Sequence, residues 1–287
     1  ALINAGAKLE LNDLRLTGGR VVQDYTDPSD DNDEGGSVLV SGAAAVMVAH
    51  SVLFGGCSQT ASDACAWQGG AVSVRKGAHV ILAESTFAGC TAHQNGGALY
   101  VATLSAKVTA TGVVFRGNKA VANMGGAVFL YDSGEAVFED GANVFLANTA
   151  PVNPSTNSIH KRGDKSNSPK LQFTTCPPGT FQYDASVNNP DKTYNIGANF
   201  TGCPNTCANG KTTEWWGANM ASSESSACVA DEVDEVDMPC PFSAETSGAY
   251  TVPDPGGCRL KTMITLNSGD VFIVSGNTTA DPLNELK

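Results

Sequence analysis

A short glycine-led phrase recurs along the first half of the chain and constrains its fold more than any other feature. Its close copies begin at Gly69-Gly70-Ala71-Val72, Gly96-Gly97-Ala98-Leu99 and Gly125-Gly126-Ala127-Val128, and a looser copy begins at Gly35-Gly36-Ser37-Val38. Successive copies start 34, 27 and 29 residues apart. A period in this range is the signature of a repeat protein, in which each unit buries its apolar face against its neighbours.

A second phrase, centred on phenylalanine, follows each glycine phrase. Its four phenylalanines are Phe54, Phe87, Phe115 and Phe145. In the last two copies the phrase reads Phe-x-x-Asn and ends in Asn118 and Asn148. A third short run of alternating or continuously apolar residues lies between the two phrases, so each period holds three β-like runs separated by Gly, Asn or Ser turns.

These patterns predict an all-β fold, a right-handed parallel β-helix with three short strands per coil and repeats of roughly 28 residues. Coils would stack at about 4.8 Å, the ordinary strand spacing. The four phenylalanines would then form an internal stack, and Asn118 would lie over Asn148 in a ladder. The Gly-Gly-Ala corner would let the backbone bend where a Cβ atom would clash. The alternative is a β-sandwich with accidental Gly-Gly pairs.

The two alternating phrases, Gly-Gly-Ala followed by Val or Leu, and Phe-x-x-Asn, resemble the repeats of the polymorphic outer membrane protein family over roughly residues 1–150. In the two earlier copies Cys57 and Cys90 stand where the family has Asn. The resemblance implies a right-handed β-helix of pectin-lyase-like shape. It implies surface adhesion, a structural role or, by analogy with distant relatives, polysaccharide cleavage.

Charge and hydropathy exclude some classes of function. The chain of 287 residues carries 17 basic and 29 acidic side chains, a formal net charge of −12, which argues against nucleic acid as a partner. It contains no run of 18 apolar residues, so we expect no membrane span. It begins at Ala1 without Met, which suggests a processed or excerpted chain.

The chain has nine cysteines, and six of them lie between Cys176 and Cys258. This usage is typical of a disulfide scaffold in an oxidising compartment. We expect disulfides among Cys57, Cys65, Cys176, Cys203, Cys207, Cys228, Cys240 and Cys258. Cys57 could close a local loop with Cys65 or pair with Cys90 of the adjacent coil; we favour the first, which leaves Cys90 free and buried.

Two further motifs predict a secreted or cell-surface protein. The phrase Cys176-Pro177-Pro178-Gly179-Thr180-Phe181 resembles the start of the ephrin-receptor-like cysteine-rich module, which implies extracellular placement and no catalysis. Asn199 and Asn277 open Asn-x-Thr glycosylation sequons.

We therefore divide the chain into four parts: a parallel β-helix over 1–150, a linker or surface crossing over 151–175, a cysteine-rich extracellular region over 176–259, and β-strands over 260–287 that complete or extend a β-helix coil.

Two kinds of ligand site are candidates. Clustered carboxylates could bind a structural calcium ion, although a solvated acidic loop is the simpler interpretation. These residues are Asp27, Asp30, Asp31, Asp33 and Glu34. We expect no other cofactor. Trp215 and Trp216 could stack on a glycan, or could pack a disulfide-rich core that lacks aliphatic residues.

The final strands suggest self-association. Met263–Leu266 and Val271–Val274 read as strands with β-helix chemistry and could form the coil beneath the first coil of another copy. Such a head-to-tail contact does not close and gives a filament. The interface would use Leu9, Leu11, Ile264, Leu266, Phe272 and Val274. Alternatively, these strands cap their own molecule.

No residue pattern assigns a catalytic group, and the four histidines are scattered along the sequence. We expect an extracellular structural or adhesive β-helix protein, a cell-surface or filament subunit that assembles head-to-tail with itself. The alternatives are a carbohydrate-active β-helix enzyme, either a lyase or a hydrolase, and a glycan-binding adhesin module.

Overall fold

The computed structural model describes most of the first 213 residues and short segments beyond them. The described ranges are 1–20, 34–56, 65–139, 142–163, 169–183, 194–208, 211–213, 220–221, 227–230, 260–265 and 271–275. The chain divides into two compact units, Ala1–Ala230 and Asp231–Lys287.

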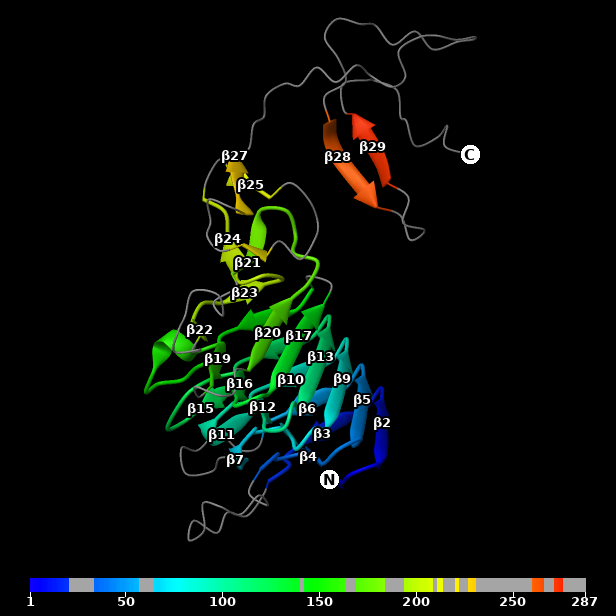
Figure 1. Ribbon diagram of the computed structural model, residues 1–287, viewed down its shortest axis with the longest axis vertical. Coiled ribbons are helices and arrows are strands. Elements are labelled where there is room, and N and C mark those ends of the chain that lie inside the picture. The colour runs from blue at the N-terminus through cyan, green and yellow to red at the C-terminus, as the bar shows by residue number, and fades with distance from the viewer. Residues whose placement is uncertain are drawn as a thin grey trace, which may run out of the picture. The chain divides into compact units, whose positions relative to one another are not determined.

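The first unit contains a parallel β-helix with three long sheets (Figure 1). In spatial order, sheet A consists of β1 (Leu2–Ile3), β4 (Val38–Ser41), β8 (Val72–Arg75), β12 (Leu99–Ala102), β16 (Val128–Tyr131), β19 (Ile159–Arg162) and β22 (Tyr194–Ile196). Sheet B consists of β2 (Lys8–Asn12), β5 (Val46–His50), β9 (His79–Ala83), β13 (Lys107–Thr111), β17 (Glu135–Glu139) and β20 (Lys170–Phe173). Sheet C consists of β3 (Arg15–Thr17), β6 (Leu53–Gly55), β10 (Thr86–Ala88), β14 (Val114–Arg116), β18 (Val144–Leu146) and β23 (Phe200–Thr201).

Strands one repeat apart pair in parallel and in register, as the sequence period predicts. Leu99 of β12, for example, faces Val72 of β8 on one side and Val128 of β16 on the other. The sequence did not predict a fourth, smaller sheet. This sheet D consists of β7 (Ala66–Gln68), β11 (Thr91–Asn95) and β15 (Lys119–Ala120).

The predicted phenylalanine stack is present inside the coils. The rings of Phe54 and Phe87 lie 4.6 Å apart, those of Phe87 and Phe115 5.0 Å, and those of Phe115 and Phe145 4.7 Å. Phe200 extends the stack at 4.5 Å from Phe145. All but Phe200 are fully buried, so the stack is the centre of a continuous core.

The glycine corners explain why the phrase repeats. The first glycine of each pair has a left-handed backbone, with φ of +63° at Gly96 and +70° at Gly125. The second glycine touches the next coil: a Cβ atom at Gly97 would lie 2.1 Å from the Gly126 carbonyl oxygen. Side chains are therefore excluded at both positions.

The asparagine ladder is also confirmed. Asn118 Nδ2 donates to Asn148 Oδ1 at 2.9 Å and to the Phe87 carbonyl at 3.1 Å. Asn118 Oδ1 accepts the Cys90 N–H at 2.9 Å. The buried amide thus satisfies main-chain groups of the adjacent coil that water cannot reach.

The helix continues beyond residue 150, where the sequence suggested a linker. β19 pairs in parallel with β16, and β20 pairs in parallel with β17, so residues 159–173 still follow the coil pattern. A 3₁₀-helix, η2 (Pro154–Thr156), turns the chain before β19. The linker assignment was wrong because this coil has Pro, Asn, Lys and Arg where earlier coils have apolar residues.

Two antiparallel strands then follow the parallel coils. β22 pairs antiparallel with β19, and β23 pairs antiparallel with β18. The chain covers the ends of sheets A and C with its own segments, while β20 is the terminal described strand of sheet B.

The cysteine-rich segment holds two described disulfides, Cys176–Cys203 and Cys207–Cys228. Its short strands are β21 (Thr180–Tyr183), β24 (Asn205–Thr206), β25 (Lys211–Thr212), β26 (Met220–Ala221) and β27 (Val229–Ala230). Cys90 is free and buried, as predicted, which excludes the Cys57–Cys90 pairing. Cys65 is disulfide-bonded, with its partner outside the described residues.

In the second unit, β28 (Leu260–Thr265) and β29 (Val271–Ser275) form an antiparallel hairpin. In a β-helix, successive strands of one coil do not pair with each other. The antiparallel pairing of β28 with β29 therefore differs from the β-helix coil that the sequence suggested for these strands. Among the described residues, no helix has the length and hydropathy needed to cross a membrane.

Candidate functional site

The first coil, made of β1, β2 and β3, is the strongest candidate for an interaction site. Each of these strands pairs with the second coil on one side, and no described strand pairs on the other. We call the unpaired sides of β1, β2 and β3 the open edge. Figure 1 shows β2, in dark blue, at one end of the row of sheet B strands.

The core is incompletely covered at the open edge. The inward side chains of β2, Leu9 and Leu11, lie over Met47 and Ala49 of β5, which are fully buried. The two leucines themselves are half-buried, as are Leu14 and Leu16. An apolar surface bordered by unpaired main-chain groups favours the addition of another strand.

The directions of the main-chain groups along β2 can be assigned. Val46 N–H donates to the Ala7 carbonyl at 2.9 Å. Because main-chain groups in a strand alternate in direction from residue to residue, the groups of Leu9 and Leu11 also face β5. Those of Lys8 and Glu10 face the open edge.

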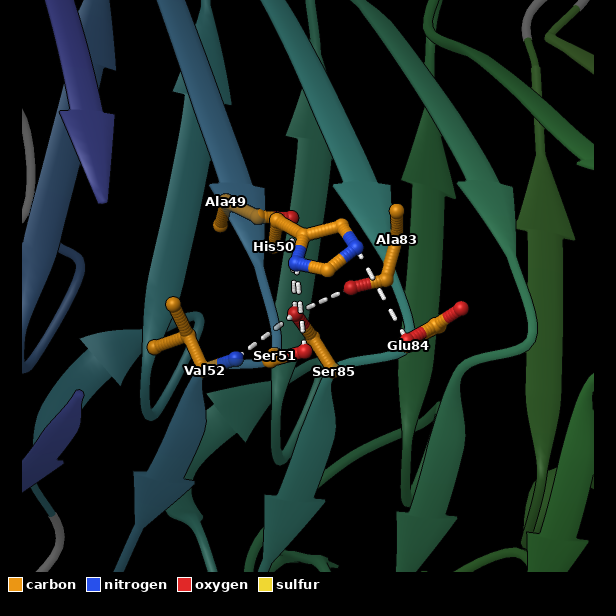
Figure 2. Close-up of polar contacts among 7 residues, drawn as sticks. All are labelled: Ala49, His50, Ser51, Val52, Ala83, Glu84 and Ser85. Carbon is orange, nitrogen blue, oxygen red and sulfur yellow. Dashed lines mark hydrogen bonds and ion pairs between the residues drawn. The ribbon is translucent and has the colours of Figure 1, made fainter. Parts of the chain in front are cut away.

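A second candidate is a polar cluster at the corner between sheets B and C (Figure 2). Ser51 Oγ lies 3.1 Å from His50 Nδ1, and Glu84 Oε2 lies 3.7 Å from His50 Nε2. Hydroxyl, imidazole and carboxylate thus follow one another in the order of a catalytic triad. The dipeptide His50-Ser51 was visible in the sequence, but only coil stacking brings Glu84 beside it.

The described surroundings of this cluster do not favour catalysis. The His50 and Glu84 side chains are 50% and 70% exposed, so water is not excluded. The nearby N–H groups are occupied: Ser51 N–H donates to the Ala83 carbonyl and Val52 N–H to Ser85 Oγ. An oxyanion hole needs such donors to be available. We interpret these contacts as part of the stacking between coils.

His160, on β19, is a buried titratable group to which the sequence analysis assigned no role. It is 2% exposed, and its Nδ1 donates to Asn195 Oδ1 of β22 at 2.6 Å. Its ring lies 5.0 Å from that of Phe129. Burial lowers the pKa of His160; the Asn195 hydrogen bond partly offsets this effect, and the charge of Arg162 adds to it.

We expect His160 to make stability depend on pH. Its pKa is lower in the folded chain than in the unfolded chain, where it is about 6.5. Below that value the unfolded chain binds a proton that the folded chain does not, so the free energy of unfolding should fall as pH decreases from about 7 to 5. Urea unfolding at several pH values measures this slope, and His160→Gln should reduce it. His50→Gln, at an exposed position, is the matched control; an equal effect of both substitutions would contradict this assignment.

The structure assigns a different role to Glu34, one of the predicted calcium ligands. Glu34 is 5% exposed; its Oε2 accepts from Ser73 Oγ at 2.7 Å, and its Oε1 accepts from Arg75 Nη1 at 3.0 Å. The Glu34 carboxylate therefore forms a buried ion pair, while the other four predicted calcium ligands lie outside the described residues. The described residues contain no group of three or more His, Cys, Asp or Glu side chains placed to bind a metal.

Several predicted site residues lie outside the described residues. These are Asp27, Asp30, Asp31, Asp33, Cys57, Trp215, Trp216, Cys240, Cys258, Leu266 and Asn277. Ile264, Phe272 and Val274 belong to the β28–β29 hairpin. Asn199 is exposed, immediately before β23.

Comparison with known proteins gives no relative: no protein-family model, curated protein or solved structure matches this chain. The assignment to a β-helix fold therefore rests on strand pairing.

Proposed function

We propose that this chain is an extracellular structural β-helix subunit that joins other copies of itself through the open edge. The observation that carries the proposal is the asymmetry of the two ends. The first coil has three strand sides that no described strand pairs with, beside half-buried leucines, whereas β22 and β23 cover two of the three long sheets at the other end.

The β28–β29 hairpin of another copy is the proposed occupant of the open edge. A two-stranded hairpin alone is at best marginally stable in water, so this one needs a surface on which to pack. Its strands have six and five residues, which is enough to match the five residues of β2. Such an assembly is head-to-tail and unclosed, and would form filaments. The alternative is that the hairpin caps the open edge of its own chain.

The proposed location follows from the disulfides and from the sequence motifs. Cys176–Cys203 and Cys207–Cys228 are most stable outside the reducing cytosol. The phrase that begins at Cys176 resembles an ephrin-receptor-like module. The β-helix repeats resemble those of the polymorphic outer membrane proteins, whose surface roles are compatible with a structural or adhesive function.

Substitution of Glu10 by proline tests the role of the open edge. The Glu10 N–H faces away from β5, so proline removes a donor that no described strand of the monomer uses, and edge strands tolerate such prolines. We expect Glu10→Pro to stay folded by circular dichroism and to lose concentration-dependent assembly in sedimentation velocity. Arg15→Pro should act in the same way on β3, because the Leu53 N–H donates to the Leu14 carbonyl and the Arg15 N–H therefore faces the open edge.

Glu10→Ala is the matched control, because it removes the same side chain but keeps the N–H. It should assemble like the wild type. Wild-type protein that stays monomeric at every concentration reached, or folded Glu10→Pro protein that still assembles fully, would rule out the open edge as the contact.

A further inference from the structure

The glycosylation sequon Asn199-Phe200-Thr201 begins one residue before β23, the strand that ends sheet C. β23 pairs antiparallel with β18, and Phe200 faces the core, 9% exposed and stacked on Phe145. Side chains alternate along a strand, so Asn199 and Thr201 lie together on the opposite face. Both residues are exposed.

The Asn199 side chain is held by its oxygen. Oδ1 accepts the Ala147 N–H at 2.9 Å, across the corner that follows β18. This contact resembles the ladder inside the coils, where Asn148 Oδ1 accepts the Asn118 N–H at 3.1 Å. Only the nitrogen of an asparagine amide is modified in N-glycosylation, so the contact through Oδ1 can persist in a glycosylated protein.

We propose that Asn199 carries an N-linked glycan that blocks strand addition at the β23 end of the helix. In the glycosylation reaction, Nδ2 of Asn199 attacks C1 of the first sugar of a lipid-linked pyrophosphate oligosaccharide. The C1–N bond forms, the C1–O bond to the pyrophosphate breaks, Nδ2 loses one proton, and the lipid pyrophosphate leaves. Eukaryotic secretory pathways supply such a donor and its transferase.

The blocking role follows from the place of the sequon in the fold. β23 is the outermost described strand of sheet C, and exposed edges invite pairing with other chains unless they are obstructed. A glycan is bulky and strongly hydrated, and it would occupy the face beside that edge. The blocking role rests on the proposed function, because a blocked β23 end would restrict assembly to the open edge. The glycosylation of Asn199 does not rest on the proposed function.

Two substitutions of Thr201 distinguish the effect of losing the sequon from the effect of losing the hydrogen bond made by Asn199. Thr201→Ala removes the sequon and keeps the Asn199 side chain, whereas Thr201→Ser keeps both and is the matched control. Each protein is expressed in a eukaryotic secretory host, and the peptide containing Asn199 is analysed by mass spectrometry before and after glycosidase treatment. We expect a glycan on wild-type and Thr201→Ser protein and none on Thr201→Ala. An unmodified Asn199 in secreted wild-type protein would overturn the proposal.

The blocking role is tested separately, by measuring the size of the assembly by sedimentation velocity in protein that also carries the Glu10→Pro substitution. There the open edge is disabled, and glycosylated protein should be monomeric. Adding Thr201→Ala should produce larger species, and Thr201→Ser should not. If removal of the glycan leaves the double variant monomeric, the blocking role is wrong. That result differs from failure of the proposed function, in which the Glu10→Pro single variant assembles like the wild type.

Discussion

Replacing Phe115 by alanine should lower the free energy of unfolding by about 3–5 kcal/mol, the usual cost of deleting a buried aromatic ring. Phe115 is fully buried in the middle of the stack, between Phe87 at 5.0 Å and Phe145 at 4.7 Å. Phe138 also packs edge-on against its ring at 6.2 Å. A cavity here cannot collapse easily, because stacked strands on both sides hold the coil spacing. Urea unfolding followed by circular dichroism measures the loss.

Arg116→Ala is the control for this experiment. Arg116 follows Phe115 in β14, but its side chain points outward and is exposed. Its substitution should change stability by no more than about 0.5 kcal/mol. A loss below about 1 kcal/mol for Phe115→Ala would mean that the stack is not the central core of the protein.

Replacing Gly97 by alanine should destabilise the fold by more than about 4 kcal/mol, or prevent folding, because the new methyl group meets backbone that cannot move aside. The added Cβ would lie 2.1 Å from the Gly126 carbonyl oxygen and 2.5 Å from the Lys119 nitrogen. Both atoms belong to the next coil, so relief of the clash would need the coils to separate. Soluble yield and urea unfolding report the effect.

Gly117→Ala is the matched control for the glycine corner. Gly117 has φ of +61°, but a Cβ atom there would meet nothing within 4 Å. Its substitution should therefore cost only the strain of a left-handed alanine, about 1–2 kcal/mol. Equal effects at Gly97 and Gly117 would contradict the close approach of coils at the corner.

The periodic residues made most of the fold predictable from the sequence. A phenylalanine, a Gly-Gly pair or an asparagine that recurs once per repeat has to occupy equivalent places in stacked coils, and the structure places Phe54, Gly97 and Asn118 in this way. The period alone therefore gave the core, the corner and the ladder.

Features outside the period were not predictable in the same way. Sheet D includes the polar run His93-Gln94-Asn95, whose strand conformation depends on pairing with neighbouring coils. β19 places His160 in a buried position that a sequence pattern would assign to an apolar residue. The sequence analysis assigned Glu34 to an acidic loop. Its partners Ser73 and Arg75 lie one repeat further along the chain, so the sequence did not show the ion pair.

The open edge was only partly visible in the sequence. The sequence analysis placed Leu9 and Leu11 in a head-to-tail interface, and the structure places both over the core. The antiparallel strands β22 and β23 were not predicted, because they lie beyond the last copy of the repeat. These two strands make the two ends of the helix different.

Amide hydrogen exchange at Glu10, measured over a range of protein concentrations, tests the proposed assembly most directly. No described strand pairs with the Glu10 N–H, whereas the Leu11 N–H faces β5 and should be protected throughout. If another copy pairs with the open edge, protection of the Glu10 amide rises with concentration while that of Leu11 stays constant. Rapid exchange at Glu10 at every concentration would contradict the assembly. Protection that does not depend on concentration would contradict it as well, since it would mean that the chain caps its own edge.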